Sequence, residues 1–289
     1  MNPSLRSKAV RLITFAIVLF IPFGIHAQLI GDTYEVAKKK KKATFLYLYS
    51  EAPGFAMNSD EGYTGVCFDI MTGFVDYLEK TENIAVEVKV RTNATDDFTY
   101  FLNAIKEAEG GVFGLSNTTI TPERLKQYKF SSPYIVNSGM ILTHESIPTL
   151  NNISEIESSF KDMTAVTVKG STNEAALLKI KKEFYPDLTI NYVHSFSEAL
   201  ETVLNDKSSF TNLDLTYYLS AKKNGHPIKR HPSGGNGAEQ FGIIMPKSND
   251  WAPLLNEFLS LYIPSEDYRK MLSKNLDPEA LEFLNNALK

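Results

Sequence analysis

The feature that most constrains the fold is an alternation of strand-type and helix-type patterns, which occurs in two successive rounds. In the first round, β-branched and aromatic residues at 44–49, alternating apolar positions at 86–90 and an apolar run at 111–116 predict three strands. Apolar residues at helical spacing predict helices at 68–78 and 98–108. Because strands that alternate with helices form parallel sheets with crossover helices, we expect an α/β fold.

The second round lies between residues 165 and 223. It contains predicted strands at 165–168, 188–193 and 210–214 and predicted helices at 174–184, 197–204 and 215–223. Two such units predict two lobes, each a mainly parallel sheet flanked by helices. We interpret the segments near 134–139 and 237–242 as two crossings between the lobes, and the helical tail at 251–288 as packing back on the first lobe. Lobe 1 would then comprise residues 43–136 and 241–289, and lobe 2 residues 137–240.

The N-terminal 27 residues have the pattern of a cleavable signal peptide. Arg6, Lys8 and Arg11 precede an apolar run at 12–25 that ends before Ala27. The run has about 14 residues, short of the roughly 20 that span a bilayer, although an uncleaved anchor stays an alternative. No cysteine follows the run to carry a lipid. The prediction is export to the periplasm as a soluble protein cleaved before Gln28.

The charge balance argues against a nucleic-acid partner. The chain has 30 basic and 34 acidic residues, and cleavage would remove three bases and no acids, leaving 27 against 34. A mildly acidic protein provides no field that attracts nucleic acid.

Residues 28–42 form a lead-in that ends in five consecutive lysines. We interpret them as a solvated segment before an edge strand, where lysines discourage edge-to-edge pairing, and contact with an anionic membrane is the alternative. The single cysteine, Cys67, cannot form an intramolecular disulfide. Apolar neighbours favour a core position for it over a role as a nucleophile.

A candidate anion receptor follows the third predicted strand. Parallel sheets bind ligands beyond the carboxyl ends of their strands. There, Thr121 and Pro122 have the N-cap and N1 pattern of a helix start, and Arg124 falls in the first helical turn. The helix dipole does not stabilise a cation at this end, so Arg124 needs another partner. That partner is either a ligand carboxylate, which its planar fork binds bidentately, or a neighbouring acidic side chain.

Two motifs at this position resemble the signature of extracellular solute-binding proteins of the polar amino-acid type, family 3. The motifs are T-I-T-P-E-R at 119–124 and Y-K-F-S-S-P-Y at 128–134. Residues 62–70 resemble the family's helix entrance, retaining Gly65 and Asp69 but departing from its common residues at 66–68. Segments 168–173 and 212–214 resemble strand-to-helix turns of the second lobe, and the resemblance spans about residues 43–280.

The resemblance implies a two-lobed periplasmic binding protein-like fold with two hinge crossings, a fold shared with the ligand core of ionotropic glutamate receptors. It also implies a clamp for a zwitterion. Arg124 and Thr119 would bind the ligand carboxylate, together with N–H groups of Ser171 and Thr172 from the opposite lobe. The ammonium would be bound by the carbonyl of Asn117 and by Asp214, and an aromatic wall would include Phe98 and Phe55. From the residues alone, Asp214 and Thr172 could instead cap helices, and Phe98 could be ordinary core.

The function implied is capture of a small amino acid-like ligand by hinge closure, for delivery to an ABC-type permease complex in the inner membrane. The protein is expected to be a monomer. We expect no enzymatic activity, cofactor or metal, because its five histidines are scattered and form no H-E-x-x-H motif. Two alternatives are a periplasmic cyclohexadienyl dehydratase, which would act on arogenate or prephenate, and the ligand-sensing subunit of a signalling system. The sequence does not identify the ligand.

Overall fold

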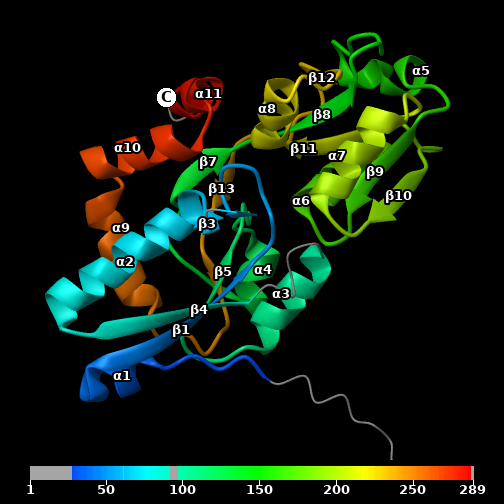
Figure 1. Cartoon of the computed structure of the whole chain (residues 1–289). Coiled ribbons are helices and arrows are strands. Elements are labelled where there is room, and N and C mark those ends of the chain that lie inside the picture. The colour runs from blue at the N-terminus through cyan, green and yellow to red at the C-terminus, as the bar shows by residue number, and fades with distance from the viewer. Residues whose placement is uncertain (1–27, 61, 92–96, 288–289) are drawn as a thin grey trace, which may run out of the picture.

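The computed structural model describes residues 28–60, 62–91 and 97–287. The predicted signal peptide at 1–27 lies outside the described residues. The chain forms two five-stranded sheets, which lie in separate lobes (Figure 1).

The first sheet has the strand order β4-β1-β5-β14-β6. β1 (Lys42–Tyr49) pairs in parallel with β4 (Ala85–Arg91) and β5 (Val112–Leu115), whereas β14 (Ile244–Met245) runs antiparallel to β5 and β6 (Lys129–Phe130). Helices α2 (Val66–Glu82), α3 (Phe98–Glu107) and α4 (Pro122–Gln127) belong to this lobe.

The second sheet has the order β10-β9-β11-β8-β12. β9 (Thr164–Val168) is parallel to β10 (Ile190–Val193) and β11 (Ser209–Asp214), whereas β8 (Gly139–His144) runs antiparallel to β11 and β12 (Ile228–Arg230). Its helices are η1 (Ile153–Glu155), α5 (Ile156–Ser159), α6 (Thr172–Glu183), α7 (Phe196–Asn205) and α8 (Leu215–Lys223). Each sheet thus has four strands in one direction, three of them adjacent and parallel, and one strand, β14 or β8, that runs opposite to them. The predicted two-lobed α/β fold is confirmed.

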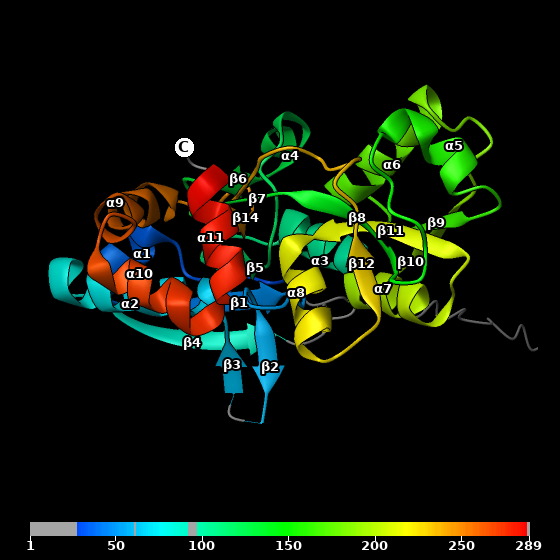
Figure 2. The ribbon, with the colours of Figure 1, turned by 90° about the horizontal axis from the view of Figure 1, so that it is seen from above.

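Two short strands connect the lobes. β7 (Ile135–Asn137) and β13 (Glu239–Phe241) pair antiparallel, with Asn137 opposite Glu239. They lie between the two sheets (Figure 1), within the segments interpreted as crossings. A separate hairpin of β2 (Met57–Ser59) and β3 (Gly62–Thr64) projects from the first lobe (Figure 2).

The lysine-rich lead-in is folded differently from its prediction. α1 (Tyr34–Lys40) begins at the N-cap Thr33 and has three exposed lysines in its last turn. Cations at this end of a helix complement its dipole, which accounts for the run. The strand that follows, β1, lies between β4 and β5 in the sheet, so the expectation of an edge strand is wrong.

The core packs mainly around the first sheet. Phe45 on β1 lies at its centre, with ring centroids 4.8 Å from Phe113 and 4.7 Å from Trp251. The same buried cluster continues across the lobe boundary to Phe196 and Leu213. A smaller cluster around Phe160 and Phe210 lies within the second lobe. The lobes are therefore in contact in this conformation.

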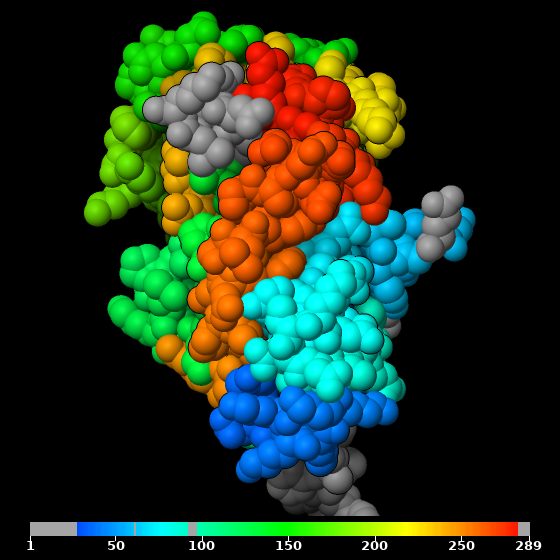
Figure 3. Space-filling model, turned by 90° about the vertical axis from the view of Figure 1, so that its left-hand side faces the viewer, coloured from blue at the N-terminus to red at the C-terminus, as the bar shows by residue number. Residues whose placement is uncertain are grey.

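The C-terminal tail consists of three helices, α9 (Ala252–Tyr262), α10 (Glu266–Asn275) and α11 (Pro278–Ala287). α9 and α10 pack on α2, as expected for a tail on the first lobe. α11 departs from that expectation, because it contacts β7 and α8 and so reaches the second lobe (Figure 3). Within the described ranges, no helix is both long and apolar enough to cross a membrane.

Candidate ligand-binding site

The first lobe contributes residues that follow β5. Asn117 and Thr119 lie in the loop after this strand, and Arg124 lies in the first turn of α4. The side chain of Thr121 accepts a hydrogen bond of 3.2 Å from the backbone N–H of Arg124, which confirms the predicted N-cap. The Arg124 side chain is only 8% exposed, so a helix start places a cation in the interior.

The second lobe contributes two strand-to-helix turns. In the turn after β9, Ser171 is the N-cap of α6 and accepts a hydrogen bond of 3.0 Å from the N–H of Glu174, while Thr172 is the first helical residue. The capping alternative considered for Thr172 is therefore wrong. Asp214 ends β11 and occupies the N-cap position of α8, but its side chain makes no capping bond. Its carboxylate is thus directed elsewhere.

These residues converge on one small cavity between the lobes. Its lining consists of Phe98, Asn117, Thr119, Arg124, Ser171, Thr172, Asn173, Phe196 and Asp214. The cavity has a volume of about 10 Å³, which is enough for about one water molecule. Seven of the eight predicted site residues meet here, from opposite lobes.

The facing groups bond to each other across the cavity. Arg124 donates from Nη1 to the carbonyl of Thr119 at 2.8 Å and from Nη2 to the carbonyl of Gly170, in the other lobe, at 3.2 Å. Asn117 Nδ2 donates to Asp214 Oδ2, also across the lobes. No acidic side chain of the described residues forms an ion pair with Arg124, contrary to the alternative of a neighbouring acid. Its guanidinium donates to two carbonyl oxygens instead.

Aromatic rings close one side of the cavity. The Arg124 guanidinium lies 5.5 Å from the ring centroid of Phe98, within range of a cation–π contact. Phe98 in turn lies 5.1 Å, centroid to centroid, from Phe196 at the start of α7. Phe98 therefore lines the cavity as well as the core, and its counterpart from the second lobe is Phe196.

Burial perturbs both charged groups. Desolvation lowers the pKa of Arg124 to about 10, a fall opposed by the negative charge of Glu239. Desolvation raises the pKa of Asp214 to about 7; Glu239 raises it further, and the hydrogen bond from Asn117 lowers it. Near neutral pH, Asp214 can therefore exist in both protonation states while Arg124 stays charged.

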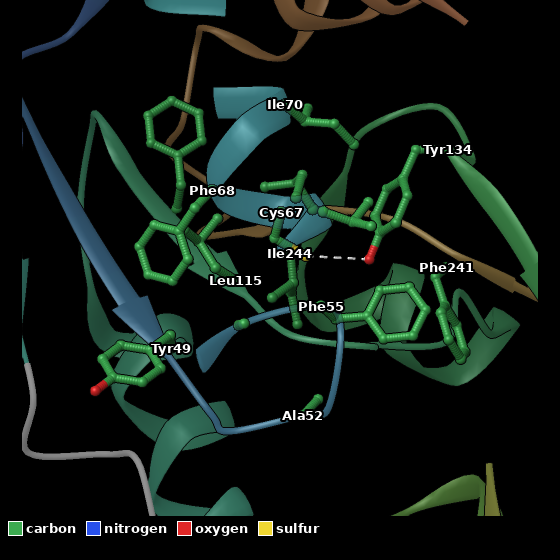
Figure 4. Packing of buried hydrophobic residues seen from close by; sticks show 14 of the residues in the cluster. Tyr49, Ala52, Phe55, Cys67, Phe68, Ile70, Leu115, Tyr134, Phe241 and Ile244 are labelled. Atoms are coloured by element: carbon green, nitrogen blue, oxygen red, sulfur yellow. Dashed lines mark hydrogen bonds between the residues drawn. The ribbon is translucent and has the colours of Figure 1, made fainter. Parts of the chain in front are cut away.

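The structure does not bring Phe55 to the cavity, contrary to the expected aromatic wall. The residue is 1% exposed, and its ring lies 5.4 Å from that of Phe241 (Figure 4). The loop that carries it is bound to the start of α2, where Cys67 N–H donates to the carbonyl of Phe55 at 2.9 Å. A Cβ on Gly65 would lie 2.4 Å from that carbonyl, so this close approach requires glycine.

Cys67 is a core residue, as predicted. Its Sγ lies 3.2 Å from Tyr134 Oη (Figure 4), and burial raises the pKa of its thiol to about 12. The thiolate needed for a nucleophile is therefore disfavoured. Among the described residues, no group of three or more His, Cys, Asp or Glu side chains could hold a metal ion.

Three residues at the site were missed from the sequence. Asn173 donates to Asn212 at 3.0 Å, Phe196 packs on Phe98, and Glu239 accepts from Thr119 and Thr172. Ser195 caps α7, so Phe196 could have been found as the first residue of a helix after a strand. Glu239 carries no such local signal.

Two α/β lobes, connected by two strands and closed over a polar cavity, define a two-lobed binding protein of the periplasmic type. The chain belongs to the family of bacterial extracellular solute-binding proteins, family 3, whose model matches residues 46–278. The family expected from the two motifs is therefore confirmed.

Solved structures similar to this chain share the fold. An ancestral arginine-binding protein bound to arginine superimposes with a TM-score of 0.65 at 21% identity, covering 81% of this chain and 98% of its own. The arginine-, lysine-, histidine-binding protein ArtJ of Geobacillus stearothermophilus gives 0.62 at 21% identity, with 84% and 99% covered. The ancestral amino acid-binding protein AncCDT-1, a precursor of cyclohexadienyl dehydratase, gives 0.63 at 21%, with 84% and 99% covered.

A curated relative is the membrane-bound lytic murein transglycosylase F of Aliivibrio fischeri. The two are 28% identical over 170 residues, which cover 57% of this chain and 31% of the relative. The match thus spans about a third of the relative's length.

Proposed function

We propose that this protein captures a small amino acid-like ligand between its two lobes by hinge closure. The observation that carries the proposal is the placement of two buried ionisable side chains of opposite type, Arg124 and Asp214, which line one cavity from opposite lobes. Arg124 binds the ligand carboxylate and Asp214 accepts a proton of its ammonium group. The similar arginine-binding protein bound to arginine and the similar arginine-, lysine-, histidine-binding protein support an amino acid as the ligand class.

The neighbouring groups complete the clamp in this proposal. Thr119 and the N–H groups of Ser171 and Thr172 bind the carboxylate, and the carbonyl of Asn117 binds the ammonium. Phe98 and Phe196 cover the aliphatic part of the ligand. The ligand carboxylate would replace an interaction that the two lobes now make with each other, the bond from Arg124 to Gly170.

Hinge motion follows from the size of the cavity. A volume of about 10 Å³ does not hold an amino acid, so the lobes separate to admit the ligand and close again around it. The paired strands β7 and β13 are the hinge, dividing lobe 1 (43–136 and 241–289) from lobe 2 (137–240). Contacts that the ligand makes to both lobes favour the closed state.

The wider role we propose is that of an exported monomer, released into the periplasm by cleavage before Gln28, that delivers its ligand to an ABC-type permease complex. The extracellular character of the family supports this role.

A binding screen tests the proposal. Isothermal titration with the common L-amino acids should give micromolar or tighter binding for at least one, and Arg124→Ala should abolish it. Arg269→Ala removes an exposed arginine on α10 and is the matched control. Failure of every amino acid to bind, or retention of binding in Arg124→Ala, would contradict the assignment.

One observation favours a second candidate, a cyclohexadienyl dehydratase-like enzyme. A buried carboxyl group with a pKa near 7, as in Asp214, suits a general acid. Incubation with arogenate or prephenate, followed by absorbance of the aromatic product, separates the two functions.

A further inference from the structure

A third charged side chain, Glu239, lies beside the clamp. It comes from the hinge strand β13 and is half-buried. Its Oε2 accepts hydrogen bonds from Thr119 Oγ1 at 3.1 Å and from Thr172 Oγ1 at 3.4 Å, one hydroxyl from each lobe. Its Oε1 accepts from Asn236 Nδ2 at 3.3 Å. The protein's own carboxylate thus bonds to residues proposed to receive the carboxylate of the ligand.

The backbone fixes Glu239 in this place. The N–H of Ile120 donates to the carbonyl of Gln240 at 2.8 Å, and Thr119 forms a β-bridge with Phe241. The strand carrying Glu239 is therefore bound to the loop carrying Thr119, and the carboxylate stays near the clamp when the first lobe moves.

The charge of Glu239 acts on both ends of the clamp. It raises the pKa of Asp214 and opposes the fall in the pKa of Arg124. Among the described residues that line the cavity, Arg124 and Asp214 are the ionisable ones, so Glu239 brings the local set to one cation and two carboxylates. A zwitterion adds one charge of each sign and leaves that imbalance unchanged.

We infer that Glu239 is a specificity-determining residue that excludes amino acids with an acidic side chain and favours those with a cationic one. This inference rests on the proposed function. A second carboxylate on the ligand would add a third negative charge to a poorly solvated site, whereas a cationic side chain balances the charge already there. Repulsion built against the wrong ligand is a common source of specificity.

The substitution Glu239→Gln tests the inference, because it removes the charge and keeps an oxygen that accepts from Thr119 and Thr172. Affinities for L-arginine, L-glutamine and L-glutamate are measured by titration at about pH 8, where Asp214 is mainly ionised. We expect the ratio of glutamate to arginine affinity to rise about tenfold or more in the variant, with glutamine intermediate. Glu239→Ala should change the ratio in the same direction.

The control is Glu145→Gln, which removes an exposed carboxylate beyond the far end of β8 and should leave the ratio unchanged. An unchanged ratio in Glu239→Gln, or an equal change for all three probes, overturns the inference while the binding function stands. Failure of these three probes and of every other common L-amino acid to bind the wild type overturns the proposed function as well.

Discussion

Two buried charges dominate the site at the scale of single residues. Arg124 and Asp214 are 8% and 5% exposed, and neither forms an ion pair among the described residues. Burying a charge with only carbonyl or amide partners carries a desolvation cost, which the shifted pKa values of both groups express. A ligand with complementary charges recovers part of that cost, which is consistent with the zwitterion that we propose as the ligand.

The raised pKa of Asp214 predicts a pH-dependent affinity. The ligand ammonium binds the ionised carboxyl, and the pKa of that carboxyl is about 7 in the closed conformation. Affinity should therefore rise by up to about tenfold per pH unit from pH 5 towards 7 and level off above it. Titration calorimetry measures this, and Asp214→Asn should lose the slope. An affinity that is flat or falls over this range in the wild type would contradict the role of Asp214.

The same shift has a consequence for stability. Because the pKa of Asp214 is higher in the folded chain than its ordinary value, the folded state binds the proton more tightly than the unfolded one. Protonation of Asp214 therefore stabilises the folded state. This contribution to the free energy of unfolding is complete below about pH 4 and is lost as the pH rises through about 7. Ligand binding opposes this loss by favouring the ionised form.

At the scale of elements, strand-to-helix turns position the site. The turns after β5, β9 and β11 supply Arg124, Thr172 and Asp214, at the carboxyl ends of strands within each parallel set. Capping by Thr121 and Ser171 fixes where α4 and α6 begin, and hence where their first side chains point.

Ser171→Ala should separate capping from ligand contact. Loss of the hydroxyl that accepts from Glu174 N–H should lower the free energy of unfolding by about 1 kcal/mol. Thr172→Ala, one residue further on, leaves the cap intact and should cost clearly less. Urea denaturation of the two variants measures the difference, and equal losses would show that Ser171 is not the stabilising cap.

Much of this arrangement could be predicted from the sequence, because its signals are local. The strand and helix patterns, the cap at Thr121 and the motif around Arg124 are each contained within about ten residues. Glu239 could not be found in this way. Its neighbours Thr119 and Thr172 are 120 and 67 residues away in the chain. The bridge between Thr119 and Phe241 and the closed arrangement of the two lobes bring all three residues together.

Phe55 has a local sequence signal, but that signal fits two different locations. An aromatic residue in a turn before a helix suits a ligand wall or a core equally well, and the choice depends on the path of the loop. Here the loop bonds to the start of α2 and turns the ring towards Phe241. The edge-strand expectation for β1 failed for a related reason, since strand order is set by pairing between distant segments.

At the scale of the whole molecule, the lobes are held together by contacts beyond the cavity. Tyr217 Oη donates to the carbonyl of Glu51 at 3.0 Å, and the N–H of Phe98 donates to the carbonyl of His194 at 3.2 Å. The helix α11 also touches β7 and α8, so it contacts both the crossing strand β7 and the second lobe. We therefore expect the proposed closure to involve β7, the cavity and α11 together.

Small-angle scattering should detect this closure. Because an amino acid does not fit the cavity of about 10 Å³, the lobes must separate to admit it. We expect this open form to predominate without ligand, so a saturating amino acid should reduce the radius of gyration. Arg124→Ala should show no such change. Identical scattering of the wild type with and without a bound amino acid would contradict hinge closure.

The most direct test of zwitterion recognition by Arg124 and Asp214 compares three forms of the best-binding amino acid: the parent, its decarboxylated amine and its des-amino acid. Calorimetric titration of wild type, Arg124→Ala and Asp214→Asn measures which group each residue recognises. We expect loss of the ligand carboxylate to weaken binding to the wild type about as strongly as Arg124→Ala weakens binding of the parent amino acid. Loss of the ammonium should likewise weaken binding to the wild type about as strongly as Asp214→Asn weakens binding of the parent. Analogues that bind the wild type as tightly as the parent would contradict recognition of a zwitterion across the two lobes.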